Sequence, residues 1–250
     1  MYTLKKSLGQ HFLKDEAICQ RIVGVLSDMP CKSLLEVGPG GGALTKYLVE
    51  LPDIDFKAVE LDDEKVAFLK KTYPQLRDKI IHQSFLDIGK PFDDRFTVIG
   101  NFPYNISTEI VFKVVEWRDS VEGMIGMFQK EVAQRLAAGE GSKVYGVTSV
   151  LTQAFFDVEY LFDVDPQAFT PPPKVMSGVL RFIPKKQPVE IASEQKLFLL
   201  VKAAFGQRRK TLRNAVRSLF GEEMLKEELF NKRAEQLSVS DFAALTFRMP

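Results

Sequence analysis

Histidine and cysteine are scarce in this chain. Its 250 residues include two histidines and two cysteines, too few for a zinc cluster or a disulfide framework. Cys19 lies on the apolar stripe of a predicted helix, together with Ile18, Ile22, Val23 and Leu26. This position favours a buried thiol over a reactive one. We therefore expect no metal site and a protein of the reducing cytoplasm.

Long apolar runs and an excess of charge of one sign are also missing. No run is long enough to cross a membrane, and the basic N-terminal segment lacks the apolar core of a signal peptide. Hydrophobic residues make up 45% of the chain, the ordinary share for a globular protein with a sizeable core. The formal net charge of +1 does not by itself indicate a nucleic-acid partner.

A glycine-rich turn follows the first predicted buried strand, residues 33–37. Gly38, Gly40 and Ala43 fit the spacing of a dinucleotide-binding turn, which lets a ligand approach the backbone between a strand and a helix. Glu36 argues against a dinucleotide, because its carboxylate would repel a pyrophosphate. It suits instead a cationic or amino-bearing ligand, such as the methionyl part of S-adenosylmethionine.

Glu60 closes the next predicted strand, residues 56–59, about twenty residues after the glycine turn. An acid at this position can accept hydrogen bonds from both hydroxyls of a ribose. A solvated acid at a strand end is the alternative interpretation. Glu36, the glycines and Glu60 together favour a bound nucleoside cofactor.

The segment Asn101-Phe102-Pro103-Tyr104 follows another predicted buried strand, residues 96–100. The Asn101 side-chain oxygen can accept from the amino group of a flat ring, and Tyr104 can stack on the ring's face. Pro103 has no N–H, so the turn presents acceptors rather than donors. A purely structural strand-to-helix turn is the alternative.

At seven places the chain resembles the ribosomal RNA small-subunit adenine dimethyltransferases, a family that includes the erythromycin-resistance methyltransferases and the mitochondrial transcription factor B proteins. The matching segments run nearly from end to end and are residues 6–13, 36–40, 60–62, 101–107, 129–133, 169–175 and 205–211. The last two favour the small-subunit enzymes. The resemblance implies S-adenosylmethionine-dependent dimethylation of N6 of two adjacent adenines in the 3′-terminal hairpin loop of 16S ribosomal RNA, and a role in subunit biogenesis.

The resemblance also implies roles for individual residues. Those implied in catalysis and base placement are Asn101, Pro103, Tyr104 and Phe169, with Tyr104 and Phe169 sandwiching the base. Those implied in binding S-adenosylmethionine are His11, Leu13, Glu36, Gly38, Gly40, Glu60, Ser84 and Asn101.

Two positions depart from the usual family pattern. His11 stands where the family usually has asparagine; an imidazole still makes one hydrogen bond, and cofactor contact can then become sensitive to pH. Ser84 stands where the family usually has aspartate, and its hydroxyl accepts from the cofactor's adenine more weakly than a carboxylate does. Asp87 is the alternative partner, although the sequence frame favours Ser84.

Basic residues gather in two segments that contain no acid, residues 1–14 and 205–217. They are Lys5, Lys6, Lys14, Arg208, Arg209, Lys210, Arg213 and Arg217. Arg209, Arg213 and Arg217 recur at i, i+4 spacing, which predicts one basic face of an amphipathic helix and a footprint for RNA phosphate. A merely solvated charged face is the alternative.

Strands and helices alternate through the first half of the chain, as in an α/β protein with a parallel sheet. We expect a Rossmann-like methyltransferase domain over residues 1–184 and a small all-helical RNA-binding domain over residues 185–250, because the prolines and charges of residues 184–188 break the periodicity. The later predicted strands are 124–128, 158–164 and 177–183. The predicted helices are 16–28, 144–156, 194–205, 211–220, 222–230 and 238–247, with N-caps at Ser193 and Ser238.

Three other functions remain open from the sequence. The chain can be mainly a non-catalytic ribosome assembly factor, or a 23S ribosomal RNA adenine methyltransferase that confers antibiotic resistance. A dinucleotide-dependent oxidoreductase is less favoured, because the sequence offers no second catalytic constellation. We expect S-adenosylmethionine as the cofactor, the small ribosomal subunit as the partner, and a monomer without membrane or metal.

Overall fold

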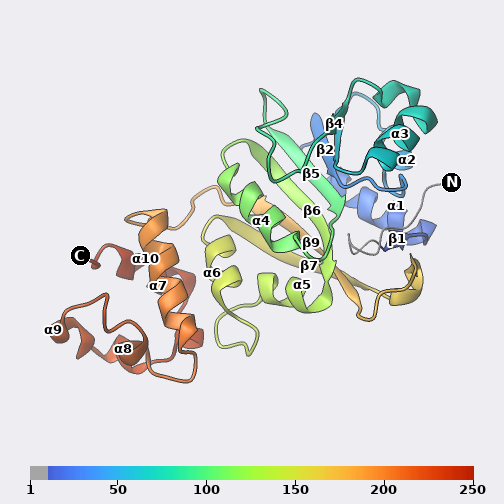
Figure 1. The fold of residues 1–250 in the computed structure, drawn as a ribbon. Helices are drawn as coiled ribbons and strands as arrows, with labels where there is room; N and C mark the ends of the chain where they lie inside the picture. The colour runs from blue at the N-terminus through green and yellow to red at the C-terminus, as the bar shows by residue number, and fades with distance from the viewer. Residues whose placement is uncertain (1–10) are drawn as a thin grey trace. The chain divides into compact units, whose positions relative to one another are not determined.

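The computed structural model describes residues 11–250, and its centre is a mixed sheet (Figure 1). The strands of this sheet are β2 (Ser33–Val37), β3 (Asp55–Glu60), β4 (Ile80–His82), β5 (Phe96–Asn101), β6 (Val121–Gln129), β7 (Phe156–Val164) and β9 (Ser177–Pro184). Their order is β4-β3-β2-β5-β6-β9-β7. Pairing is parallel from β4 to β6 and antiparallel between β6 and β9. The predicted α/β class is confirmed.

Residues 11–250 also contain ten α-helices. They are α1 (Glu16–Gly24), α2 (Thr45–Leu48), α3 (Asp63–Thr72), α4 (Ser107–Glu116), α5 (Lys130–Ala137), α6 (Val147–Gln153), α7 (Glu194–Gly206), α8 (Leu212–Ala215), α9 (Glu222–Leu225) and α10 (Val239–Thr246). The predicted N-caps are confirmed: Ser193 accepts from Lys196 N at 3.1 Å, and Ser238 accepts from Asp241 N at 3.0 Å. In residues 11–250 no helix is both long and apolar enough to span a membrane.

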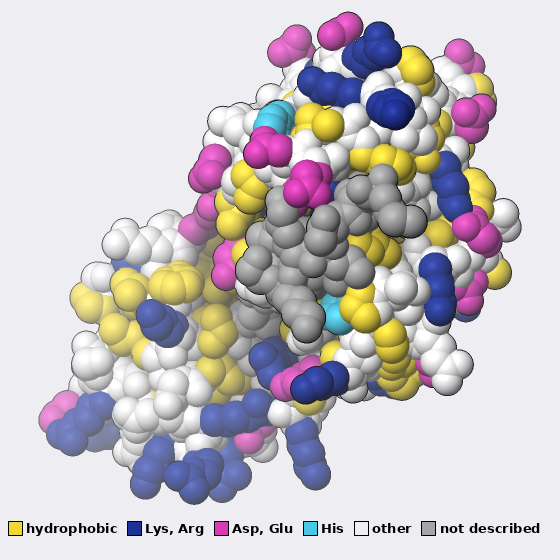
Figure 2. Space-filling view, turned by 45° about the vertical axis from the view of Figure 1, so that its right-hand side comes forward, with side chains coloured by type: hydrophobic (Ala, Val, Ile, Leu, Met, Phe, Trp, Pro, Cys, Tyr) yellow, Lys and Arg dark blue, Asp and Glu magenta, His cyan; other side chains and the backbone are white. Residues whose placement is uncertain are grey.

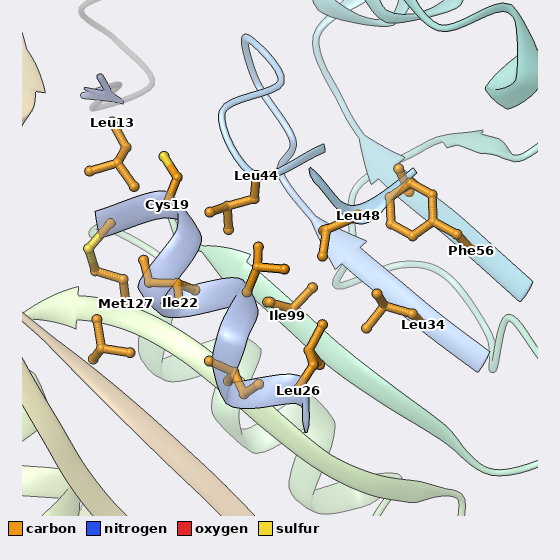
Figure 3. Close-up of a cluster of buried hydrophobic side chains, with 14 of the residues drawn as sticks. Leu13, Cys19, Ile22, Leu26, Leu34, Leu44, Leu48, Phe56, Ile99 and Met127 are labelled. Carbon is orange, nitrogen blue, oxygen red and sulfur yellow. The ribbon is translucent and has the colours of Figure 1, made fainter. Parts of the chain in front are cut away.

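The core on one face of the sheet forms around α1. Figure 3 shows the side chains of Cys19 and Ile22 in α1, and of Leu26 just after it, packed toward the strands, where Ile99 and Met127 belong to β5 and β6. The burial expected for Cys19 is confirmed, since it is 1% exposed. Burial raises the pKa of its thiol to about 11, so Cys19 is a core residue rather than a nucleophile.

The carboxyl ends of the parallel strands bring distant segments together. Val37 ends β2, Glu60 ends β3 and Asn101 ends β5, and β2 lies between β3 and β5 in the sheet. Because parallel strands point the same way, the three ends share one edge. A two-stranded ladder of β1 (Phe12–Leu13) and β8 (Phe169–Thr170) pairs Leu13 with Phe169.

Contacts divide the chain into two compact units. One unit contains the chain up to Ala133 and Glu159–Pro184, and the other contains Gln134–Val158 and Lys185–Pro250. A break therefore falls after Pro184, where the sequence places its boundary. Gln134–Val158, which the sequence assigns to the first domain, groups with the C-terminal helices instead. The reason is tertiary: α6 packs against α7, and Lys185 N donates to Phe155 O at 2.8 Å.

The prediction of one basic helix over residues 211–220 is wrong. Only Leu212–Ala215 is helical, so Arg209 precedes α8 and Arg217 follows it. Arg213 instead holds a turn together: its Nε donates to Leu225 O at 2.6 Å and its guanidinium donates to Asn231 Oδ1 at 2.8 Å. These bonds need the chain to fold back after α8, and such tertiary contacts override a local helical pattern.

Candidate active site

One cavity of about 290 Å³ lies at the edge where β2, β3 and β5 end. Every residue predicted to bind the cofactor lines it: His11, Leu13, Glu36, Gly38, Gly40, Glu60, Ser84 and Asn101. Pro103 and Tyr104 of the base-reading turn line the same cavity. The structure thus brings the glycine turn and the Asn101 turn to one place.

The glycine turn needs backbone conformations that favour glycine. Gly38 has φ of 67° and Gly40 has φ of 55°, both in the left-handed region. A Cβ at Gly40 would lie 3.4 Å from Phe12 Cε1, and one at Gly38 would lie 3.8 Å from Pro103 Cδ. The N-terminal segment and the base-reading turn therefore pack directly against this backbone.

Glu36 is a buried acid in the cavity wall. It is 2% exposed, and Thr45 Oγ1 donates to its Oε2 at 2.7 Å. Burial raises the pKa of Glu36 to about 8; the Thr45 bond opposes part of this rise, and the nearby Glu60 carboxylate adds to it. The side chain is thus mostly protonated at neutral pH, and a ligand cation would favour its ionised form.

Glu60 has a different environment, rich in main-chain donors. Its Oε2 accepts from Gly40 N at 3.1 Å, and its Oε1 accepts from Leu61 N at 2.9 Å and from Asp62 N at 3.0 Å. A carboxylate has about four acceptor positions, so these bonds leave about one, on Oε2. The structure therefore offers room for one ribose hydroxyl, where the sequence suggests two.

Asn101 is oriented by the N-terminal segment. Its Nδ2 donates to His11 O at 3.3 Å, which leaves its Oδ1 as the acceptor on a side chain that lines the cavity. The next residue, Phe102, donates from its N–H to Met127 O at 3.3 Å. An acceptor in this position is what recognition of an amino group requires.

Tyr104 and His11 hold each other at the cavity. The Tyr104 hydroxyl forms a hydrogen bond with Ser177 Oγ at 2.6 Å. The centroids of the Tyr104 and His11 rings lie 5.7 Å apart. His11 Nδ1 is 2.9 Å from Pro171 O, and because a carbonyl only accepts, Nδ1 carries the proton of this bond. Tyr104 is half-buried, and burial raises the pKa of its hydroxyl despite the Ser177 bond.

After β4 the chain places Ser84, and not Asp87, at the cavity. Ser84 lines the cavity and its Oγ accepts from Leu86 N at 3.3 Å. Asp87 is exposed and does not line the cavity. This placement agrees with the choice of Ser84 that the sequence frame favours.

Phe169 does not lie where a base-stacking residue would. It is 1% exposed and belongs to the core cluster, and it is absent from the residues that line the cavity. Its strand pairs it with Leu13, and an apolar ring is more stable in this core than on an open wall. Of the two rings predicted to sandwich a base, the structure places only Tyr104 at the cavity.

Other residues that line the cavity have no role in the sequence prediction, among them Phe12, Leu61 and Lys65. Leu61 is 59% exposed although it is apolar, and Lys65 is 4% exposed although it is charged. Lys65 Nζ lies 5.2 Å from the centroid of the Phe12 ring. Leu61 directly follows Glu60, and this adjacency is a signal that the sequence offers. Nothing in the spacing of Lys65 distinguishes it from a solvated lysine.

The predicted RNA-binding residues fall into three groups. Lys5 and Lys6 lie outside the described residues. The unit of Gln134–Val158 and Lys185–Pro250 is called the helical unit below. Within it, Arg208 and Arg213 are partly buried and donate to main-chain carbonyls, Arg208 to Ser142 O at 3.3 Å and Arg213 to Leu225 O. Arg209, Lys210 and Arg217 are exposed, and within residues 11–250 their side chains make no hydrogen bond or ion pair. Figure 2 shows Lys and Arg side chains gathered toward the lower edge of the view, where α8 and α9 lie.

Metal chemistry has no candidate centre in the described part of the chain. Residues 11–250 contain no group of three or more His, Cys, Asp or Glu side chains placed to hold a metal ion.

The sequence is similar to a described family and to named relatives. The family model for "Ribosomal RNA adenine dimethylase" matches residues 1–247. "Ribosomal RNA small subunit methyltransferase A" of Cytophaga hutchinsonii is 51% identical over 97% of this chain and 95% of its own. The protein of the same name from Flavobacterium johnsoniae is 50% identical over 97% of this chain and 94% of its own.

Solved structures share the fold. A dimethyladenosine transferase from Plasmodium falciparum superposes with a TM-score of 0.79 and is 24% identical in sequence. The match covers 93% of this chain and 94% of that one. The 23S rRNA methyltransferase ErmE has a TM-score of 0.69 and 22% identity, and covers 93% of this chain and 99% of its own. At these identities the likeness concerns the fold alone.

Proposed function

This chain belongs to the ribosomal RNA adenine dimethylase family, and we propose that it is a methyltransferase that dimethylates N6 of adenine in small-subunit ribosomal RNA. We place the targets at two adjacent adenines in the 3′-terminal hairpin loop of 16S ribosomal RNA. Relatives of about 50% identity named for the small subunit favour this substrate over 23S ribosomal RNA.

The observation that carries the proposal is the shared cavity. Glu36, Glu60 and the glycine turn line the same space as Asn101 and Tyr104, so a cofactor and a target base would meet there. When bound, S-adenosylmethionine supplies an activated methyl group. The residues fit it: Glu36 meets a cationic methionyl group, Glu60 accepts from a ribose hydroxyl, and Ser84 accepts from the adenine amino group.

The base-reading turn would act by position and not by covalent chemistry. Asn101 Oδ1 accepts from N6–H of the target adenine, and the main-chain carbonyl near Phe102 or Pro103 accepts the other hydrogen. Holding both hydrogens draws the nitrogen toward tetrahedral geometry and leaves its lone pair free to attack. The Tyr104 ring stacks on the base, which must leave its own stack to enter the cavity.

The exposed cations of the helical unit would contact RNA phosphate. Arg209, Lys210 and Arg217 are exposed, whereas Arg213 is committed to the turn after α8. We propose that these three side chains, with Lys5 and Lys6, set which adenines reach the cavity. We further propose a monomer that acts on small subunits in the cytoplasm.

A methyl-transfer assay tests the proposal. Purified protein, labelled S-adenosylmethionine and immature small subunits should give label in the small-subunit RNA, and mass spectrometry of the digested RNA should identify N6,N6-dimethyladenine. Large subunits serve as the matched control. Label in large-subunit RNA alone would favour a resistance enzyme, and no label in either would leave only a non-catalytic assembly role.

A further inference from the structure

Two glycines form a slot beneath the base-reading turn. Gly100 of β5 and Gly126 of β6 are partners in the sheet. A Cβ at Gly126 would lie 2.4 Å from Phe102 Cε2, and a Cβ at Gly100 would lie 2.6 Å from Phe102 Cε1. We call Gly100 and Gly126 the glycine slot. The Phe102 ring therefore lies directly on two adjacent backbones, which no side chain other than hydrogen permits.

The slot belongs to the face of the sheet opposite the cluster of Figure 3. Side chains alternate along a strand, and Ile99 and Met127 point into that cluster, so Gly100 and Gly126 face the other way. There the Phe102 ring is 1% exposed. It makes an edge contact with Phe128, whose centroid is 5.3 Å away.

The slot lies immediately next to the reacting groups. Asn101, Phe102 and Pro103 all line the cavity, and the Phe102 N–H is bonded to Met127 O. A rigid ring fitted between two glycines leaves its own residue little freedom. It thereby fixes the distance of Asn101 and Pro103 from the sheet. It also fixes their distance from the glycine turn, where Pro103 packs against Gly38.

We propose that Phe102, seated in the glycine slot, is a positioning residue that sets the place of the Asn101 acceptor during methyl transfer. The inference rests on the proposed function and adds to it a ring that is 1% exposed and carries no hydrogen-bonding group. Removing part of the ring shifts the turn without removing any hydrogen-bonding group. Displacements of about 1 Å at a reacting centre commonly cost about a hundredfold in rate.

Ordinary core packing is the competing explanation, and the chain offers a matched control. Phe182 of β9 is also 1% exposed, and its ring lies 5.9 Å from that of Phe128, so it belongs to the same row of rings. It is not part of the turn. Phe102→Leu and Phe182→Leu remove the same atoms from the same layer, and only Phe102→Leu should affect base placement.

The first comparison uses these two variants. For each we would measure the unfolding midpoint, the affinity for S-adenosylmethionine and single-turnover methyl transfer to small subunits. We expect both to lower stability alike and to bind the cofactor normally, with transfer slowed about tenfold or more only in Phe102→Leu. Equal transfer rates for the two variants would overturn the inference.

A double-mutant cycle gives an independent test. In Gly126→Ala the new methyl would lie 2.4 Å from Phe102 Cε2 and 2.7 Å from Phe128 Cε2, so the ring of Phe102, the nearer of the two, must move and transfer should slow. Adding Phe102→Leu relieves the closer contact, and the double variant should transfer faster than Gly126→Ala alone. Effects that simply multiply would refute the slot. If the wild type transfers no methyl group, the proposed function fails first; if it does transfer, these results test the slot alone.

Discussion

Binding of S-adenosylmethionine should release a proton from Glu36. The carboxyl group is 2% exposed, and burial raises its pKa to about 8. Its neighbours are the Thr45 hydroxyl, the Glu60 carboxylate and Tyr73, whose own pKa is raised by burial and by Glu36. A cationic methionyl group brought against this acid favours the ionised form, so binding and ionisation are linked.

The size of the effect follows from the pKa. At pH 7, below a pKa of about 8, most molecules hold the proton, and ionising Glu36 costs about 1 kcal/mol. Affinity should therefore rise with pH, by at most about tenfold for each pH unit, up to about pH 8 and level off above it. Most of one proton should leave per cofactor bound at pH 7.

Calorimetry in two buffers of different ionisation enthalpy measures this proton directly. Glu36→Gln keeps the acceptor for Thr45 but cannot ionise, so it should bind more weakly above pH 8 and show neither proton release nor the rise with pH. If the wild type releases no proton at pH 7, or if Glu36→Gln retains the same pH dependence, Glu36 is not the group that ionises on binding.

The same residue predicts how stability depends on pH. The pKa of Glu36 is raised in the folded protein from its usual 4.5 to about 8, so between these values the folded state holds a proton that the unfolded state has lost. The contribution of Glu36 to stability is complete below about pH 4.5 and declines as the pH rises toward 8. Urea unfolding at pH 6 and pH 9 should show a smaller decline for Glu36→Gln than for the wild type.

Three further predictions concern the other parts of the site. Glu60→Gln should weaken S-adenosylmethionine binding by about 1–3 kcal/mol in calorimetry, because one acceptor facing Gly40 N becomes a donor. Asn101→Ala should raise the barrier to methyl transfer by about 3 kcal/mol, while the melting temperature stays within a few degrees; unfolding or normal transfer would contradict a catalytic role. Replacing the three exposed cations by alanine should lower the log–log salt slope of small-subunit binding by about 2–3, whereas Arg213→Ala should lower stability and keep the slope; the three are Arg209, Lys210 and Arg217.

The cavity could be predicted from the sequence because its signals are local. Glu36, Glu60 and Asn101 each stand at the end of a short apolar run, and parallel strands deliver their carboxyl ends to one edge whatever the rest of the chain does. The N-caps Ser193 and Ser238 are local for the same reason. Each of these features depends on neighbours within a few residues.

The features that could not be predicted depend on contacts between distant segments. The i, i+4 arginines read as one helix, but the bonds of Arg213 to Leu225 and Asn231 bend the chain after four helical residues. The family resemblance implies that Phe169 stacks on the base. In the structure its strand pairs it with Leu13, and its ring is buried in the core. The spacing of residues in the sequence does not indicate which distant residues a side chain will contact in the folded protein.

Two acids in one cavity show how such partners divide the chemistry. Glu60 accepts from three main-chain N–H groups, which fix its oxygens in place as acceptors. Glu36 accepts from one hydroxyl, and burial and the Glu60 carboxylate raise its pKa, so a nearby cation would favour its ionised form. If both acids were ionised in the empty cavity, their repulsion would have to be overcome before any ligand bound. A Glu36 that is mostly neutral before binding reduces that repulsion, and the proposed cofactor, S-adenosylmethionine, would supply the cation that favours its ionised form.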